Sequence, residues 1–249
     1  MVRSYASVAV WCTGLVLLAY GCVASPHLGK DEGREAVVWQ HQPLAAPATP
    51  TPSAASDSEA ALLAQLHEAE GKGDDLAVAG MLYNLAILRR QQGASAEAER
   101  LYRGALGIRE RRQGPNHPDV AVVLNNLATL EAAQENYAAA LPLFERALRI
   151  RQLAFGDEHV LTAESLNNLA LLHAAQGNAA IAEPLYQRAV AILEQMNAAD
   201  RSASYRGELG RVLDNYAALL HDTGRDTEAA ALEARARVTG AGQPPDAGR

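Results

Sequence analysis

The side chains best suited to bind something in this sequence are amides that recur at a fixed spacing. Asn84, Asn126 and Asn168 lie 42 residues apart, and Asn215 follows 47 residues after Asn168. An amide side chain offers both a hydrogen-bond donor and an acceptor. A row of amides can therefore pair with the backbone of an extended peptide, whatever the side chains of that peptide are. The same amides can instead bond to one another inside the fold, and the sequence leaves both interpretations open.

Sequence patterns for catalysis are missing. The chain contains no G-x-S-x-G nucleophile motif, no phosphate-binding loop and no H-E-x-x-H zinc motif. His117 and His159 stand at equivalent positions of one repeated loop, where they can either ligate a metal or cap the helix that follows. We expect capping, because other histidines at ligand spacing are lacking. The sequence thus predicts that the protein is not an enzyme and has no cofactor and no metal site.

The overall charge argues against binding to nucleic acid. The 249 residues carry a net charge of −7, and the 22 basic residues are spread along the chain without a basic stripe. Aromatic residues make up only 5% of the chain, so the core consists mainly of alanine and leucine. That composition favours closely packed helices.

Each recurring asparagine lies within a longer repeated unit of two helices. Apolar residues follow helical spacing around the asparagine (helix A) and again after a turn (helix B). The turn position is occupied by glycine in three units, which suits a left-handed helix end. Glu135 replaces this glycine in the second unit, so we expect Asn136 to adopt the positive φ there.

These units resemble the tetratricopeptide repeat in the 42-residue form found in kinesin light chains. The stretches NNLATLEAAQENYAAALPLFERALRIRQLAFGDEH and NNLALLHAAQGNAAIAEPLYQRAVAIL carry the resemblance, together with the loop GPNHPDVA. It covers residues 75–238 and implies an all-α fold, a right-handed superhelical solenoid of about four helix pairs. We expect residues 58–74 to form an N-terminal capping helix.

The resemblance also implies a concave peptide-binding groove lined mainly by the A helices. In this family the second asparagine of each pair is often structural, and the residue before it points more into the groove. Arg90 lies at one end, where it can meet an acidic group of the ligand. The predicted groove residues are Tyr83, Asn84, Arg90, Asn125, Asn126, Thr129, Asn167, Asn168, Leu171 and Asp214.

The N-terminus reads as an export signal with a lipid-attachment site. Arg3 precedes an uncharged, mostly apolar run from Ala6 to Tyr20. This run is shorter than the ~20 residues that a spanning helix needs and suits a signal peptide. The following LAYGC resembles the bacterial lipobox, in which the cysteine, here Cys22, is lipidated and becomes the mature N-terminus. An uncleaved anchor, or an ordinary signal peptide with an incidental Cys22, are the alternatives.

These features predict five segments. Residues 1–21 are the lipoprotein signal peptide, and residues 22–57 are a Pro/Ala-rich disordered tether. The capping helix and the repeat domain follow, and residues 239–249 are a disordered tail. By resemblance to Gram-negative sorting, Val23 after the cysteine favours the outer membrane, facing the periplasm.

Together the patterns predict a non-catalytic protein–protein interaction module anchored to the bacterial cell envelope. It binds a protein or extended peptide in the concave groove to assemble or regulate a complex. One alternative is a self-associating structural scaffold of the envelope, which makes a homo-oligomer possible. Another is a soluble adaptor, if Cys22 is not lipidated.

Overall fold

The computed structural model describes residues 52–199 and 203–240, and this part of the chain is all-α. The predicted fold class is confirmed. The predicted signal peptide, Cys22, nearly all of the tether and residues 241–249 lie outside the described residues. The helices are α1 (Pro52–Lys72), α2 (Asp75–Gln91), α3 (Ser95–Gln113), α4 (Pro118–Ala133), α5 (Tyr137–Phe155), α6 (Val160–Ala175), α7 (Ala179–Ala199), α8 (Ala203–Asp222) and α9 (Asp226–Gly240).

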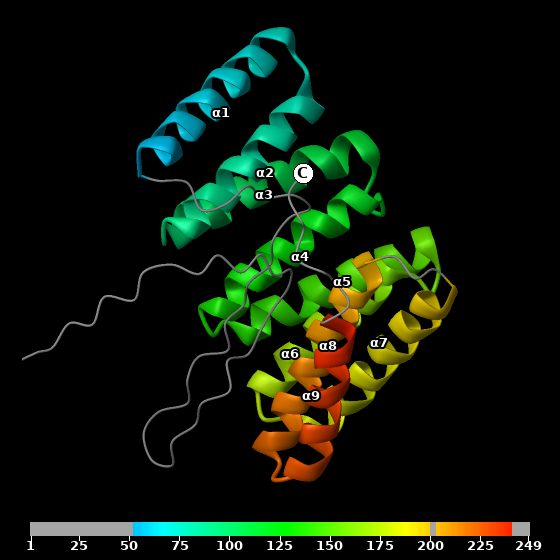
Figure 1. The fold of residues 1–249 in the computed structure, drawn as a ribbon. Coiled ribbons are helices and arrows are strands. Elements are labelled where there is room, and N and C mark those ends of the chain that lie inside the picture. The colour runs from blue at the N-terminus through cyan, green and yellow to red at the C-terminus, as the bar shows by residue number, and fades with distance from the viewer. Residues whose placement is uncertain (1–51, 200–202, 241–249) are drawn as a thin grey trace, which may run out of the picture.

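The helices pack as consecutive pairs that stack on one another. Within the described residues, α2 pairs with α3, α4 with α5, α6 with α7, and α8 with α9, and each second helix then packs on the next pair. Figure 1 shows this stack running from α1 at one end to α9 at the other. Helix α1 packs on α2 as α3 packs on α4. It therefore takes the place of a B helix in an N-terminal unit for which the described residues contain no A helix.

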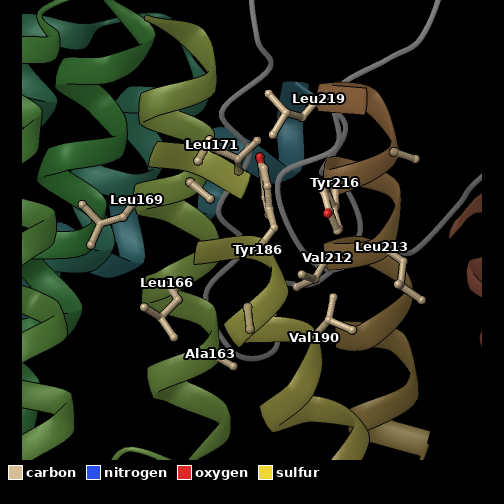
Figure 2. Packing of buried hydrophobic residues seen from close by; sticks show 14 of the residues in the cluster. Ala163, Leu166, Leu169, Leu171, Tyr186, Val190, Val212, Leu213, Tyr216 and Leu219 are labelled. Carbon is tan, nitrogen blue, oxygen red and sulfur yellow. The ribbon is translucent and has the colours of Figure 1, made fainter. Parts of the chain in front are cut away.

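In the first three units, one aromatic side chain fills the space between neighbouring pairs. Tyr102, Phe144 and Tyr186 occupy equivalent places on α3, α5 and α7 and are at most 1% exposed. Figure 2 shows Tyr186 lying between Leu171 of α6 and Tyr216 of α8, and the Tyr186 and Tyr216 rings are stacked with centroids 5.7 Å apart. Because such side chains bury large apolar areas, they supply much of the cohesion between units.

The turn inside each unit needs one residue with positive φ. Gly93, Gly177 and Gly224 provide it in three units, but in the second unit Glu135 itself has φ 62°. Asn136 has φ −78°, so the prediction that Asn136 makes this turn is wrong. The reason is that the turn keeps the hydrogen bonds of its glycine equivalents, including Asn136 N–H to Glu131 O at 2.9 Å. These bonds place the left-handed residue at position 135 whatever its side chain.

The repeated histidines cap helices, as predicted. The Nδ1 atoms of His117 and His159 accept hydrogen bonds from the N–H groups of Asp119 and Leu161, each at 3.2 Å.

Helix α1 begins at Pro52, before the predicted start at residue 58. No helix in the described ranges is both long and apolar enough to cross a membrane.

Candidate peptide-binding face

The paired asparagines join the A helices to one another. We call α2, α4, α6 and α8 the A-helix row. Asn126 Nδ2 donates to the Tyr83 hydroxyl at 3.0 Å, which links α4 to α2. Asn168 Nδ2 donates to Asn125 Oδ1 at 2.8 Å and Asn215 Nδ2 to Asn167 Oδ1 at 3.0 Å, which links the remaining helices. These three contacts, the asparagine ladder, repeat one geometry along the row.

The side chains of the ladder are buried. Asn125, Asn167 and Asn168 are each 1% exposed, Asn126 is 5% exposed, and Thr129 is 1% exposed and donates to Asn125 O at 2.9 Å. We expected Asn125 and Asn167 to present their amides to a ligand, and the structure differs. The next A helix lies close enough for its own asparagine to bond to each of their oxygens. Since buried polar groups need partners, these amides hold the units together in this structure.

The residues that hold the equivalent positions at the two ends of the A-helix row, outside the three ladder contacts, are exposed. Asn84 on α2 is equivalent to Asn126, Asn168 and Asn215, and Asp214 on α8 is equivalent to Asn125 and Asn167; both end residues are exposed. No A helix precedes α2 or follows α8 among the described residues. Partial desolvation and then Glu233 raise the pKa of the Asp214 carboxyl.

Three further residues predicted to line the groove are buried or half-buried by neighbouring side chains: Tyr83, Arg90 and Leu171. The Tyr83 ring lies 5.8 Å from the Tyr102 ring and under the Arg109 guanidinium, 5.7 Å away. Burial raises the pKa of Tyr83, and the charge of Arg109 opposes this rise. Arg90 is half-buried, and its charge moderates the rise that burial causes in the pKa of Tyr102. Leu171 is 3% exposed and belongs to the core.

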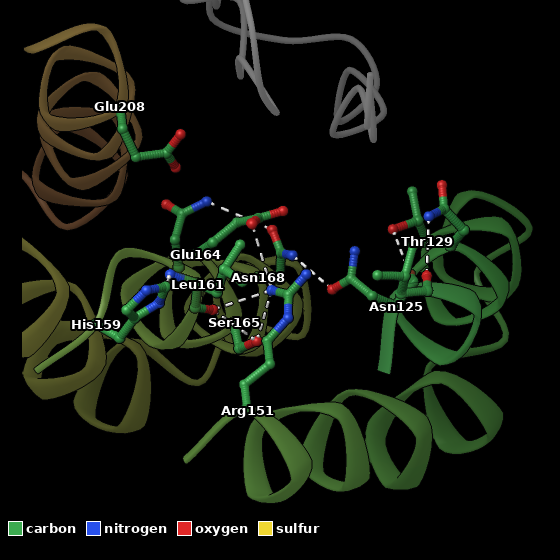
Figure 3. Close-up of polar contacts among 12 residues, drawn as sticks. Asn125, Thr129, Arg151, His159, Leu161, Glu164, Ser165, Asn168 and Glu208 are labelled. Atoms are coloured by element: carbon green, nitrogen blue, oxygen red, sulfur yellow. Dashed lines mark hydrogen bonds and ion pairs between the residues drawn. The ribbon is translucent and has the colours of Figure 1, made fainter. Parts of the chain in front are cut away.

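Two arginines that were not among the residues predicted from the sequence connect this row to the B helices. Arg151 on α5 is 4% exposed, and its Nη1 donates to Leu161 O at 3.0 Å and to Ser165 Oγ at 2.9 Å (Figure 3). Arg109 is the equivalent residue of α3 and donates to Asp119 O at 3.1 Å. Each guanidinium fixes the first turn of the next A helix to the preceding B helix. Their 42-residue spacing was the signal that could have revealed them.

Small side chains stay accessible at the C-terminal ends of α4 and α6. Ala133 is exposed and Ala174 and Ala175 are half-buried, and half-buried Arg90 holds the equivalent place near the end of α2. Half-buried Glu164 and His173 on α6 add polar groups to the row. The small side chains leave room for an extended chain to approach the ends of these helices. Across the described ranges, no group of three or more His, Cys, Asp or Glu residues is arranged to hold a metal ion.

Comparison with known proteins agrees with this geometry. Residues 77–152 and 119–195 match the tetratricopeptide repeat model. Residues 77–195 are tetratricopeptide repeats. No curated protein matches the sequence.

Solved structures show the same fold. BtubC (BKLC) from P. vanneervenii is 24% identical, with a TM-score of 0.67 and coverage of 78% of this chain and 78% of that chain. A protein of Podosopora anserina, described as a kinesin light chain with nearly identical TPR-like repeats, is 20% identical. Its TM-score is 0.60, with coverage of 76% of this chain and 88% of that chain. At these identities the likeness concerns the tetratricopeptide repeat fold alone.

Proposed function

We propose that the protein is a non-catalytic interaction module that docks a protein or extended peptide on the A-helix row. Proteins built from tetratricopeptide repeats generally mediate protein–protein contacts. The observation that carries the proposal is the accessible strip of Ala133, Ala174 and Ala175 at the C-terminal ends of α4 and α6, with Arg90 near the C-terminal end of the neighbouring α2. Small side chains let a ligand backbone approach, and the charge of Arg90 favours an acidic group of the ligand at that end.

The ladder supports this proposal by making the binding surface rigid before a ligand arrives. Three hydrogen bonds of 2.8–3.0 Å fix the spacing of neighbouring A helices. A preformed surface loses less conformational freedom on binding, which favours affinity. The ladder amides contribute to recognition by positioning the row.

We further propose that Cys22 carries a lipid and holds the repeats at the bacterial envelope, at the outer membrane facing the periplasm. The lipobox-like LAYGC and the proline-rich stretch after it support this proposal. Residues 22–51 span about 90 Å when fully extended at ~3.1 Å per residue. Such a tether would let the repeats work away from the membrane surface. Fractionation of a Cys22→Ser variant tests the anchor, because loss from the membrane fraction is expected and an unchanged distribution would contradict it.

Crosslinked capture from the native envelope tests the binding face. A double variant, Ala133→Arg with Ala175→Arg, places two long side chains on the A-helix row and should lose the partner that the wild type captures. The matched control, Ala138→Arg with Ala191→Arg, makes the same change at exposed positions of the B helices and should retain it. Circular dichroism checks that both variants fold. Equal capture by both double variants would contradict the proposal, and recovery of the protein alone would favour the self-associating scaffold.

A further inference from the structure

The two ends of the solenoid differ in the side chains that they expose. At the C-terminal end, Glu233 stands where Tyr102, Phe144 and Tyr186 stand in the preceding units. Exposed Arg237 stands in the place of half-buried Leu106 and Leu148 and buried Val190. Because both replacements are charged, the outer surface of α8 and α9 is suited to water and not to another helix.

The N-terminal end keeps apolar side chains and a free ladder position. Leu62, Leu63 and Leu66 of α1 are only half-buried, and Leu76 at the start of α2 is 44% exposed. Asn84 is exposed, although its equivalents Asn126, Asn168 and Asn215 are at most 5% exposed. Charged replacements like those at the other end are lacking at these positions.

The geometry of the ladder shows what would cover this end. In all three contacts of the ladder, the second asparagine of one A helix donates to a side-chain oxygen of the A helix before it. Asn84 holds that donor position on α2, so its amide belongs opposite an A helix that precedes α2. Helix α1 packs on α2 as a B helix. Among the described residues, the element that would complete this unit is therefore a single A helix next to α1 and α2.

We propose that this N-terminal end binds an amphipathic α-helix of a partner protein, which completes the unpaired unit in trans. The helix would bury a stripe of leucine and alanine against α1 and α2. One Asn, Asp or Tyr on it would accept the hydrogen bond of Asn84, as Tyr83, Asn125 and Asn167 accept theirs. Glu68 pairs with Lys72 on α1, whereas exposed Glu70 favours a basic residue along the edge of the partner helix. This surface is distinct from the A-helix strip proposed above.

Two other occupants are less suited to this position. An A helix of this chain in the register of the repeat, 42 residues before α2, would contain Pro43 and Pro47, and proline in a helix interior removes a backbone hydrogen bond and clashes with the preceding turn. In a second copy each of the described A helices is already packed against its own B helix, so none is a single helix available for this place. A helix from another protein meets neither difficulty.

A helix with this chain's own A-helix sequence is the sharpest probe. The probe is a fluorescent peptide of residues 160–175, with two lysines added at each end, titrated against the full mature chain. Its Asn167 supplies the acceptor for Asn84. We expect saturable binding with a Kd below about 1 mM. Asn84→Leu in the chain, or Asn167→Leu in the peptide, should each weaken binding about five- to tenfold. The two changes together should cost little more than either one, since they remove the same hydrogen bond.

Three controls locate the site and identify the occupant. Asp214→Leu alters the other end of the ladder and should leave the Kd unchanged, as should Ala133→Arg with Ala175→Arg. The inference is overturned if the peptide does not bind, if Asn84→Leu has no effect, or if either control variant abolishes binding. A loss confined to the Ala133 and Ala175 variant would leave the proposed function standing. Sedimentation of the chain alone should show a monomer, and a dimer that Asn84→Leu dissociates would assign this end to a second copy instead.

Discussion

The third and fourth helix pairs follow the same plan but differ wherever a following pair would make contact. On α7, Tyr186 is fully buried against the next pair, while α9 carries half-buried Glu233 at that place. On the A helices, Asn167 is buried and bonded to Asn215, while Asp214 is exposed. The comparison shows that the residue type at each of these positions depends on whether another unit packs against it. The residue is apolar or an amide where the next helix pair packs, and charged in the last described pair.

The helix B aromatic should show the largest difference between the two units. Tyr186→Ala should lower the free energy of unfolding by about 3–5 kcal/mol, because it leaves a cavity between α6, α7 and α8. Glu233→Ala at the equivalent place should cost less than about 1 kcal/mol, because its ion pair with His221 is solvent-accessible and weak. Urea unfolding followed by circular dichroism measures both. Similar losses for the two variants would mean that the last unit is not a solvent-facing cap.

The ladder position before each asparagine should show the next largest difference. Asn167→Ala removes the acceptor of Asn215, which is 2% exposed, and leaves its amide unpaired, at a cost of about 1–3 kcal/mol. Asp214→Ala removes an exposed carboxylate that no following A helix among the described residues covers, and should change stability by at most about 0.5 kcal/mol. The same urea titrations compare them. The account of the ladder would be weakened if Asp214→Ala proved as costly as Asn167→Ala.

The turn of the second unit offers a change that should stabilise the protein. Glu135 has φ 62° where the third unit has Gly177 with φ 77°. A non-glycine residue in this conformation is strained, so Glu135→Gly should raise the free energy of unfolding by about 1 kcal/mol. Gly177→Glu, the reverse change in the neighbouring unit, should lower it by a similar amount. Differential scanning calorimetry measures the shift in Tm, and a fall in Tm for Glu135→Gly would show that the glutamate side chain stabilises the turn.

The smallest expected effect concerns pH and the last unit. His221 Nδ1 lies 2.7 Å from Asp226 Oδ1, and its Nε2 lies 3.1 Å from Glu233 Oε1. Hydrogen bonds to Asp226 and then Glu233 raise the pKa of His221 above its ordinary value of 6.5. A pKa raised by folding means that the protonated form is stabilised. This contribution is fully present below pH 6.5 and is lost as the pH rises through the raised pKa.

A variant separates this titration from the others in the chain. Wild-type stability, measured as the urea midpoint from about pH 5.5 to pH 8.5, should fall more over this range than that of His221→Gln. The difference should be slight, because the side chain is accessible to solvent, which screens its charge. Parallel pH profiles for the two proteins would show that the carboxylates do not act on His221.

The sequence was sufficient for the fold because the repeat is explicit. The 42-residue spacing of the asparagines and the repeated turn positions predicted four helix pairs, and the solenoid has them. The caps made by His117 and His159 were predictable as well, since both residues stand in a repeated loop directly before a helix. Local patterns of this kind depend on neighbours a few residues away.

The candidate site was harder to predict because it depends on contacts between units. The distance between α4 and α6 decides whether the Asn125 amide is open to a ligand or bonded to Asn168. That distance cannot be predicted from the sequence of one unit. The turn at Glu135 shows the same limit, since its φ is set by the backbone bonds of the turn and not by the preference of its side chain. The sequence shows Arg109 and Arg151 at a spacing of 42 residues. Their hydrogen-bond partners could not be predicted from it, because those partners lie on the following helix.

The most direct test of the central claim, that the ladder amides hold neighbouring units together, is a double-mutant cycle on Asn125 and Asn168. Asn125→Ala, Asn168→Ala and the double variant are unfolded in urea and compared with the wild type. The account predicts a coupling energy of about 1 kcal/mol or more, because either single change breaks the same buried hydrogen bond. A coupling energy near zero would contradict it, and would return these amides to the role of ligand contacts.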